Sequence, residues 1–370
     1  MKNYSILIVI TLLVIISCKK NKEQTTQIPN EADVKELAMG PYVLSQITSK
    51  ENLQVFAITG KDEIKKEYIT LDIALKEKKV EVRETSNVNE LRIDNNSEDT
   101  IFIHSGDIVK GGKQDRTVAN DVIIKPNAKN VPLASFCVEQ GRWSPRKGER
   151  SDKFEENSKM LSSKKLKLAA RYDSNQQKVW EKVSEEQSKL NNNLSSRTGN
   201  KVDVTENESA SSLQLTLESN ELKKVKKELQ ESVIKGLKNK DNVIGYAYAI
   251  NGKVYGVDIY NSKKLFKDLT PKITESIVTE AIVESNDSIP TKAKIVDVKH
   301  FIEQSKMIED SNKTKKINET TELNIRETKE GYLTFSSIDK DQKKWIHKNY
   351  LKKEKENKKS TTVLSTQRRR

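Results

Sequence analysis

Short runs of alternating apolar and polar residues between about residues 38 and 143 predict a β-rich region. Residues 53–59 (LQVFAIT) and 79–85 (KVEVRET) alternate in the way that half-buried strands do. The other elements expected here are strands at 91–97, 100–109 and 131–139 and a short helix at 70–78. Strands at this spacing favour a sandwich- or barrel-like sheet.

A helical period replaces this alternation after Gly148, where the chain becomes rich in Lys, Glu, Ser and Asn. Ser219 or Asn220 can cap the second of two expected helices, and residues 191–200 between the helices are linker-like. The apolar stripes are Val179, Trp180, Val183 and Leu190 in one helix, and Leu222, Val225, Leu229, Val233 and Leu237 in the other. We expect this region to be a solvated helical excursion from the core.

Strand character returns at residues 243–260, where Asn251-Gly252 between two apolar runs predicts a tight hairpin. A helix should follow, broken or restarted at Pro271, then a helix around residues 296–304 and a small hairpin at 321–338. The pattern therefore predicts an α+β fold. Its mostly antiparallel, sandwich- or barrel-like β core carries a helical insertion and is completed by a β-hairpin plus helix.

The N-terminus has the pattern of an export signal. Lys2 precedes an apolar run from Ile6 to Ile16 that is too short to span a bilayer, and Ser17-Cys18 follows in the manner of a bacterial lipobox. We expect Cys18 to be lipidated and to anchor the protein to a membrane of the bacterial cell envelope, on the periplasmic or the surface face. Residues 19–33 contain few large apolar side chains and predict a flexible tether.

The net charge of +13 is concentrated partly at the C-terminal end, where residues 351–370 hold eight Lys or Arg and two Glu. In an exported chain this charge favours anionic lipid over nucleic acid as a partner. The expected organisation is a signal peptide at 1–17, a tether at 18–37, a β-rich half of the core at 38–150, a helical insertion at 151–240, a hairpin and helix completing the core at 241–310, a small C-terminal hairpin region at 311–350 and a basic disordered tail at 351–370.

The polar stretch KGGKQDR, residues 110–116, is the first candidate for chemistry. It does not match a phosphate-binding P-loop, because Gly112 stands where that motif requires Lys. Its glycines can nevertheless adopt positive φ, and Lys113 and Arg116 lie close in sequence to Asp107 and Asp115. Two interpretations stay open: an anion-binding loop, or a bulge in which Arg116 pairs with Asp115.

The second candidate is FCVEQGRW, residues 136–143. Cys137 lies on an apolar strand, where a free cysteine is usually buried; alternatively it is a nucleophile with His104 as base and Glu139 orienting that base. Arg142 and Trp143 would place an aromatic surface beside a cation. The chain has three histidines without metal-binding spacing, so we expect no metal site.

The stretches GGKQDR, FCVEQGRW and VIGYAYAINGKVYGVDIY together resemble the bacterial domain named for its association with ADP-ribosylglycohydrolases and rhodanese-phosphatase-superfamily proteins. The resemblance runs from about Asn52 to Glu284, and the family has no established activity. The family-motif positions that it implies here are Gly111, Gly112, Lys113, Gln114, Arg116, Glu139, Gly141, Arg142 and Trp143.

We interpret the chain as an exported, lipid-anchored module that binds a small anionic ligand or an envelope protein, without a cofactor. In this hypothesis Lys113, Arg116 and Arg142 hold the anion. Other residues expected at the ligand are Gly111, Gly112, Gln114 and Trp143. One alternative is a thiol- or acid/base-assisted hydrolase of a phosphate- or ADP-ribose-like substrate that uses Cys137, His104 and Glu139. Another is a structural envelope lipoprotein, and whether the protein is an enzyme stays open.

Overall fold

The computed structural model describes residues 35–155, 160–205, 209–286, 288, 291–307 and 309–354. The expected signal peptide, Cys18, nearly all of the tether and most of the basic tail lie outside these residues. Within the described part of the chain, no helix combines the length and apolarity needed to cross a membrane.

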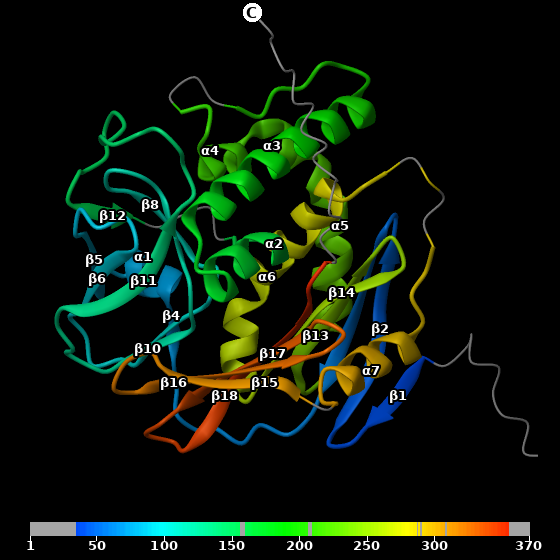
Figure 1. The fold of residues 1–370 in the computed structure, drawn as a ribbon. Helices are drawn as coiled ribbons and strands as arrows, with labels where there is room; N and C mark the ends of the chain where they lie inside the picture. The colour runs from blue at the N-terminus through cyan, green and yellow to red at the C-terminus, as the bar shows by residue number, and fades with distance from the viewer. Residues whose placement is uncertain are drawn as a thin grey trace, which may run out of the picture. The chain divides into compact units, whose positions relative to one another are not determined.

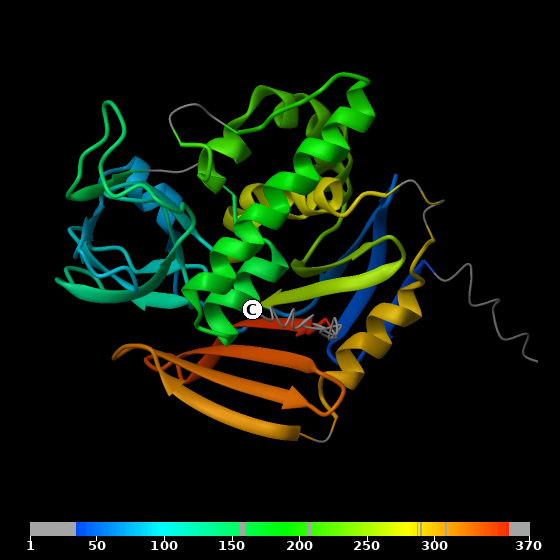
Figure 2. The same cartoon turned by 45° about the horizontal axis from the view of Figure 1, so that its top comes forward.

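The largest element is an antiparallel sheet of nine strands (Figure 1). In spatial order its strands are β1 (Glu36–Met39), β2 (Tyr42–Lys50), β3 (Leu53–Thr59), β13 (Val243–Ile250), β14 (Lys253–Tyr260), β18 (Lys344–Lys352), β17 (Tyr332–Asp339), β16 (Thr321–Thr328) and β15 (Glu309–Lys316). The expected C-terminal hairpin is thus part of the main sheet, because β18 joins β17 to β14. Figure 2 shows β15, β16 and β17 continuing the sheet beyond this junction.

The hairpin predicted at residues 243–260 is confirmed as β13 and β14. Asn251 and Gly252 both have positive φ, at 51° and 74°, as a tight hairpin turn requires. A Cβ on Gly252 would lie only 2.2 Å from the Thr291 hydroxyl oxygen, so the turn also needs glycine for space.

The second β unit is a closed barrel, which confirms the barrel-like expectation. Its order is β11 (Val131–Cys137), β6 (Glu90–Asn95), β5 (Val80–Glu84), β12 (Lys153–Glu155), β8 (Ile108–Gly111) and β9 (Arg116–Val118), and β10 (Val122–Ile124), β7 (Ile101–Ile103) and β4 (Ile69–Thr70) form a small sheet. The single strand expected at 100–109 is instead two strands, β7 and β8. A turn at His104–Asp107 separates them, with Gly106 at φ 92° and the His104 amide donating to the Asp107 carboxylate at 2.8 Å.

Seven α-helices lie among the described residues. Their bounds are α1 (Leu71–Lys76), α2 (Lys164–Lys167), which runs into a π-helical turn, η2 (Leu168–Tyr172), α3 (Gln176–Thr198), α4 (Leu213–Glu218), α5 (Asn220–Lys238), α6 (Lys263–Val283) and α7 (Ile295–Gln304). Helices α5 and α6 pack together and against β2 and β13, and α3 packs on α6. The predicted cap of α5 is confirmed, since the Ser219 hydroxyl accepts from the Leu222 amide.

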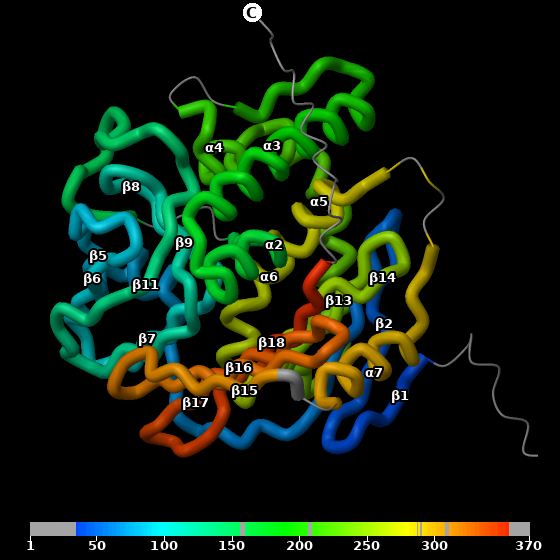
Figure 3. Tube along the Cα trace, in the orientation of Figure 1, coloured from blue at the N-terminus to red at the C-terminus, as the bar shows by residue number. Residues whose placement is uncertain are grey.

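Two expectations about the helices were wrong. The linker predicted at 191–200 is the C-terminal part of α3, which ends at Gly199 with φ 70° and buries Leu194. Helix α6 continues through Pro271, and its Cα trace is unbroken (Figure 3). Burial of Leu269 and Ile273 on either side of the proline explains why tertiary packing outweighs the lost hydrogen bond there.

The helices at 176–198 and 220–238 belong to the core rather than forming a solvated excursion. Leu190 and Leu229 are buried in the same apolar cluster as Val55 and Ala57 of β3 and Ile277 of α6. Sparse apolar residues are enough to bury one face of each helix in the core, because they fall on the same side of that helix.

Candidate functional site

The KGGKQDR stretch runs from the end of β8 through the connecting loop to the first residue of β9. Gly111 and Gly112 have φ values of 112° and 56°, and a Cβ on Gly112 would lie 2.4 Å from the Phe154 ring. The Gly111 amide donates to the Asp115 carboxylate at 2.9 Å. The glycines therefore let the loop fold inward over Phe154 and enclose Asp115.

Arg116 does not form an ion pair with Asp115, the bulge pairing considered from the sequence. Its fully buried guanidinium lies 3.2 Å from a Glu84 carboxylate oxygen and donates to the Gln114 carbonyl at 3.1 Å. Asp115 pairs with Arg146 through two contacts of 2.6 and 3.0 Å, and it accepts a hydrogen bond from the Ser212 hydroxyl at 2.9 Å. Arg146 was not singled out by the sequence motifs.

Glu139 and Arg142 extend this ion network. The Arg142 guanidinium lies 2.6 Å from the Glu139 carboxylate, which also accepts from the Asp115 amide at 3.2 Å. Gln114 donates to the Glu139 carbonyl at 2.8 Å. Burial raises the pKa of Asp115, whereas for Glu139 the effect of burial is outweighed by Arg142, so that its pKa is lowered. The arginines of both motifs are thus held by carboxylates of the protein itself.

Trp143 forms an exposed aromatic surface beside this network. The residue is 47% exposed, the Lys113 ammonium lies 5.1 Å from its ring centroid and the Arg116 guanidinium lies 5.8 Å from the same centroid. The aromatic surface beside a cation, expected from FCVEQGRW, is therefore present at the rim of the barrel.

Cys137 and His104 lie in different surroundings. Cys137 is buried at the end of β11, its amide donates to Gln176 at 2.8 Å, and burial raises the pKa of its thiol to about 11. The hydrogen-bond partners of the His104 ring are Tyr260 and the Ser105 carbonyl, while Glu139 contacts the arginines. No hydrogen bond among the described residues joins the three residues of the proposed triad.

His104 belongs instead to a buried cluster with His347 of β18. The centroids of the two rings lie 4.7 Å apart, and Tyr260 stacks on His347 at 4.4 Å. His347 contacts Asp121 at 2.8 Å and Asp258 at 2.9 Å. Burial lowers the pKa of His104 well below its usual value; for His347 the attraction of Asp121 outweighs burial and the pKa is raised.

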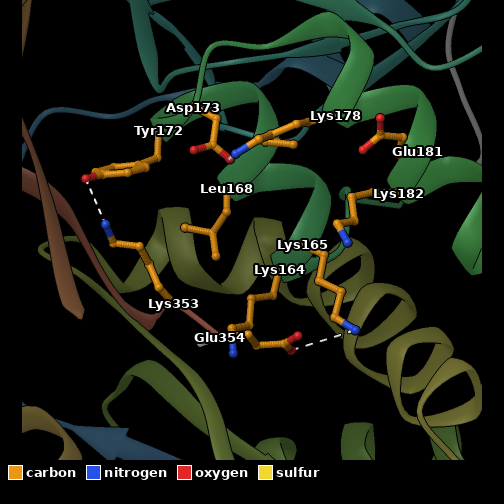
Figure 4. Close-up of a pocket in the computed structure, with 11 residues that line it drawn as sticks. Lys164, Lys165, Leu168, Tyr172, Asp173, Lys178, Glu181, Lys182, Lys353 and Glu354 are labelled. Atoms are coloured by element: carbon orange, nitrogen blue, oxygen red, sulfur yellow. Dashed lines mark hydrogen bonds and ion pairs between the residues drawn. The ribbon is translucent and has the colours of Figure 1, made fainter. Parts of the chain in front are cut away.

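A lysine-rich pocket of about 650 Å³ lies beside α2, η2 and α3, where β18 ends (Figure 4). Its walls hold five lysines against three carboxylates. The lining residues are Lys164, Lys165, Leu168, Ala169, Tyr172, Asp173, Lys178, Glu181, Lys182, Lys353 and Glu354. A neighbouring hollow of about 450 Å³ shares Lys164, Lys353 and Glu354 with it. No sequence motif had indicated this pocket.

Lys164 is the most unusual of these lysines. It is 6% exposed, and its ammonium lies 4.6 Å from the centroid of the Tyr255 ring. Among the described residues, no carboxylate oxygen lies within 4.0 Å of this ammonium, and burial lowers its pKa. By contrast, the Lys165 ammonium lies 3.0 Å from Glu284, and Lys353 donates to the Tyr172 hydroxyl at 3.0 Å.

Comparison with known proteins identifies the family but not an activity. No curated protein and no solved structure is significantly similar to the chain. The model of one family, described as the ARG and Rhodanese-Phosphatase-superfamily-associated Protein domain (ARPP-1), matches residues 41–351. This range contains the whole barrel, the helices, and the nine-stranded sheet except for β1 and the last residue of β18. The chain therefore belongs to the ARPP-1 family, as its three motifs had suggested.

Proposed function

We propose that this protein binds a small anionic ligand in the lysine-rich pocket of Figure 4. The observation that carries the proposal is Lys164, a buried cation that faces an aromatic ring and lacks a close carboxylate in the described structure. A buried charge without a partner destabilises a folded protein. An anion bound beside Lys164 would offset that cost, so binding and the charge of Lys164 would reinforce each other.

The surroundings of Lys164 fit an anion that carries phosphate or carboxylate groups. Lys165, Lys178, Lys182 and Lys353 line the same pocket, each already in an ion pair with a carboxylate of the protein, and lysine binds phosphate as a compact, mobile charge. A volume of about 650 Å³ lies within the usual range for small-molecule sites. The Tyr172 ring in this pocket and the Tyr255 ring in the neighbouring hollow supply apolar surface for the uncharged part of such a ligand.

This proposal keeps the ligand class expected from the sequence but places the ligand elsewhere. Arg116 and Arg142 are held by Glu84 and Glu139, so an anion at KGGKQDR would have to displace a carboxylate already in place. By contrast, no carboxylate oxygen of the described residues lies within 4.0 Å of the Lys164 ammonium, although Glu280 and Glu354 attract it from farther away. In the predicted loop, the Lys113 cation lies beside the exposed Trp143 ring.

Export and lipid anchoring at Cys18 are the second part of the proposal. The support is the sequence alone: a basic start, a short apolar run and a lipobox-like Ser17-Cys18. Mass spectrometry of the protein from bacterial membranes should find an N-terminal lipidated cysteine, and Cys18→Ala should abolish the modification. Recovery of an unprocessed, unlipidated wild-type chain would contradict this part.

The ligand proposal can be tested by thermal unfolding of the full-length chain in detergent with nucleotides, ADP-ribose, phosphosugars and dicarboxylates. A ligand at 100 times its dissociation constant adds about 2.7 kcal/mol of stability, a readily measured shift. Lys164→Met should abolish the shift, while Lys267→Met, on the exposed face of α6, should retain it.

The same variants report on the unliganded protein. Lys164→Met should increase the free energy of unfolding by roughly 0.5–2 kcal/mol and so raise the melting temperature, because it removes the buried charge and keeps the length of the side chain. Lys267→Met should leave the melting temperature nearly unchanged. A ligand shift that survives in Lys164→Met, or no shift with any anion of the panel, would refute the pocket as an anion site; the latter result would favour a protein partner.

A further inference from the structure

The buried cluster around His104 and His347 has the composition of a metal centre. His104 follows β7, Asp258 and Tyr260 lie on β14, and His347 lies on β18. We propose that His104, His347 and Asp258 bind one divalent cation of the zinc class. Each offers a ligand atom, and the three atoms lie within 4.8 Å of one another in a fully buried position.

The two imidazole rings are oriented as metal-binding histidines are. The His104 Nδ1 atom lies 2.6 Å from the Ser105 carbonyl oxygen. A carbonyl oxygen can only accept, so Nδ1 carries the proton and the lone pair of a neutral ring is on Nε2. The His347 Nδ1 atom lies 2.8 Å from the Asp121 carboxylate. Histidines that bind metals typically donate their second ring N–H to a carbonyl or a carboxylate in this way.

The partner of His347 is itself held in place. Asp121 is fully buried, and its carboxylate contacts Arg171 at 3.2 Å and accepts a hydrogen bond from Ser337. With Asp121 fixed, the ring of His347 cannot rotate freely, and its Nε2 atom points to Asp258 at 2.9 Å, so a cation bound at Nε2 would displace the proton that these two groups share and release it to solvent. The cluster therefore has an outer layer of hydrogen bonds that orients the ligand atoms.

The distances between ligand atoms suit a small cation. Bonds of about 2.0–2.1 Å in a tetrahedral zinc site place neighbouring ligand atoms about 3.3 Å apart. The Asp258 oxygen lies 2.9 Å from His347 Nε2, and the Tyr260 hydroxyl lies 2.8 Å from His104 Nε2. The three ligand atoms all lie within 4.8 Å of one another, so a bound cation would draw the widest pair together by at most about 1.5 Å, with the Tyr260 hydroxyl or a water as fourth ligand. Imidazole with one carboxylate favours zinc over calcium or magnesium.

The test uses the full-length chain, stripped of metal with a chelator and titrated with Co²⁺, the spectroscopic substitute for Zn²⁺. We expect one equivalent to bind, with visible d–d absorption, no thiolate charge-transfer band, and loss of the signal on adding Zn²⁺. Metal analysis after dialysis against Zn²⁺ should also give one zinc per chain. No uptake of either ion by the wild-type protein would overturn the proposal, and this measurement needs no variant.

Variants locate the site. His104→Gln and Asp258→Asn should each weaken cobalt binding at least tenfold, and Asp121→Asn, which acts through His347, should weaken it roughly 10–100-fold. His300→Gln is the matched control, because His300 is an exposed histidine on α7, outside the cluster. Unchanged binding in folded His104→Gln, or an equal loss in His300→Gln, would place the metal elsewhere and refute the assignment.

Discussion

The Asp115–Arg146 pair provides a direct test of how burial determines the strength of an ion pair. The Arg146 guanidinium contacts both Asp115 oxygens, at 2.6 and 3.0 Å, and the two side chains are 0% and 4% exposed. The chain also contains a matched surface pair, because Arg150 contacts both Asp152 oxygens at 2.8 and 2.9 Å. The Arg150 and Asp152 side chains are 62% and 57% exposed. The two pairs share residue types and two-point geometry and differ mainly in exposure to water.

We predict that Asp115→Asn costs about 3–5 kcal/mol of unfolding free energy, whereas Asp152→Asn costs less than about 1 kcal/mol. The asparagine keeps the shape of Asp115 but removes the charge that Arg146 faces. One acceptor oxygen also becomes an amide group, so an Arg146 contact or the Ser212 hydrogen bond is lost, at about 1.5–3 kcal/mol for a bond to a charged group. Glu139 and Glu149 still face Arg146, which keeps the cost at the lower end of this range.

The measurement is urea unfolding of both variants and the wild type, followed by circular dichroism, with the free energies extrapolated to water. Sodium chloride at 1 M should reduce the small effect of Asp152→Asn and leave that of Asp115→Asn nearly unchanged, because salt screens exposed charges far more than buried ones. Equal costs for the two variants, or a cost below about 1 kcal/mol for Asp115→Asn, would refute the view that this motif is a buried ion network.

Three further predictions concern the core. Cys137 should react with a thiol reagent much more slowly in the folded protein than in urea at pH 8, because burial raises its pKa to about 11; equal rates would show that the thiol is accessible. Burial raises the pKa of Glu186 from 4.5 to about 8, because the folded protein favours the protonated carboxyl. The contribution of Glu186 to the free energy of unfolding is therefore fully present below about pH 4.5 and is lost as the pH rises through 8. Glu186→Gln should therefore flatten the fall in melting temperature between pH 5 and 9. A variant whose melting temperature depends on pH as the wild type's does would show that Glu186 is not the titrating group. Leu190→Ala should cost about 2–5 kcal/mol in urea unfolding, since this leucine is fully buried; a cost below 1 kcal/mol would restore α3 as a solvated excursion.

Local patterns in the sequence predicted most of the helices and strands, because turns, caps and amphipathic faces depend on residues that are neighbours in the sequence. The hairpin at Asn251-Gly252 and the cap at Ser219 are examples of such local signals. The break expected at Pro271 was wrong because burial of distant parts of the chain holds α6 together. The split of residues 100–109 into two strands depends on the Asp107 side chain closing a turn, which alternation does not reveal.

The site was harder to predict because its residues meet only through the fold. The motifs did indicate a dense polar cluster, and Gln114, Arg116, Glu139 and Arg142 do contact one another or shared partners. Their charge partners include Glu84 and Arg146, which no motif contains. His104 and His347 are far apart in sequence, so a search for metal-binding spacing could not find them. A lysine such as Lys164 looks like any other in a lysine-rich sequence until its burial is known.

The position of β18 also constrains the order in which the molecule can be completed. This strand lies between β14 and β17, yet it is the last strand among the described residues, so the two halves of the nine-stranded sheet are joined only when Lys344–Lys352 are available. A chain that emerges from its N-terminus first has an open edge at β14 until then, and an unpaired edge strand can pair with other chains. Because β18 also carries His347, arrival of the C-terminal strand closes the sheet and completes the histidine cluster in the same step.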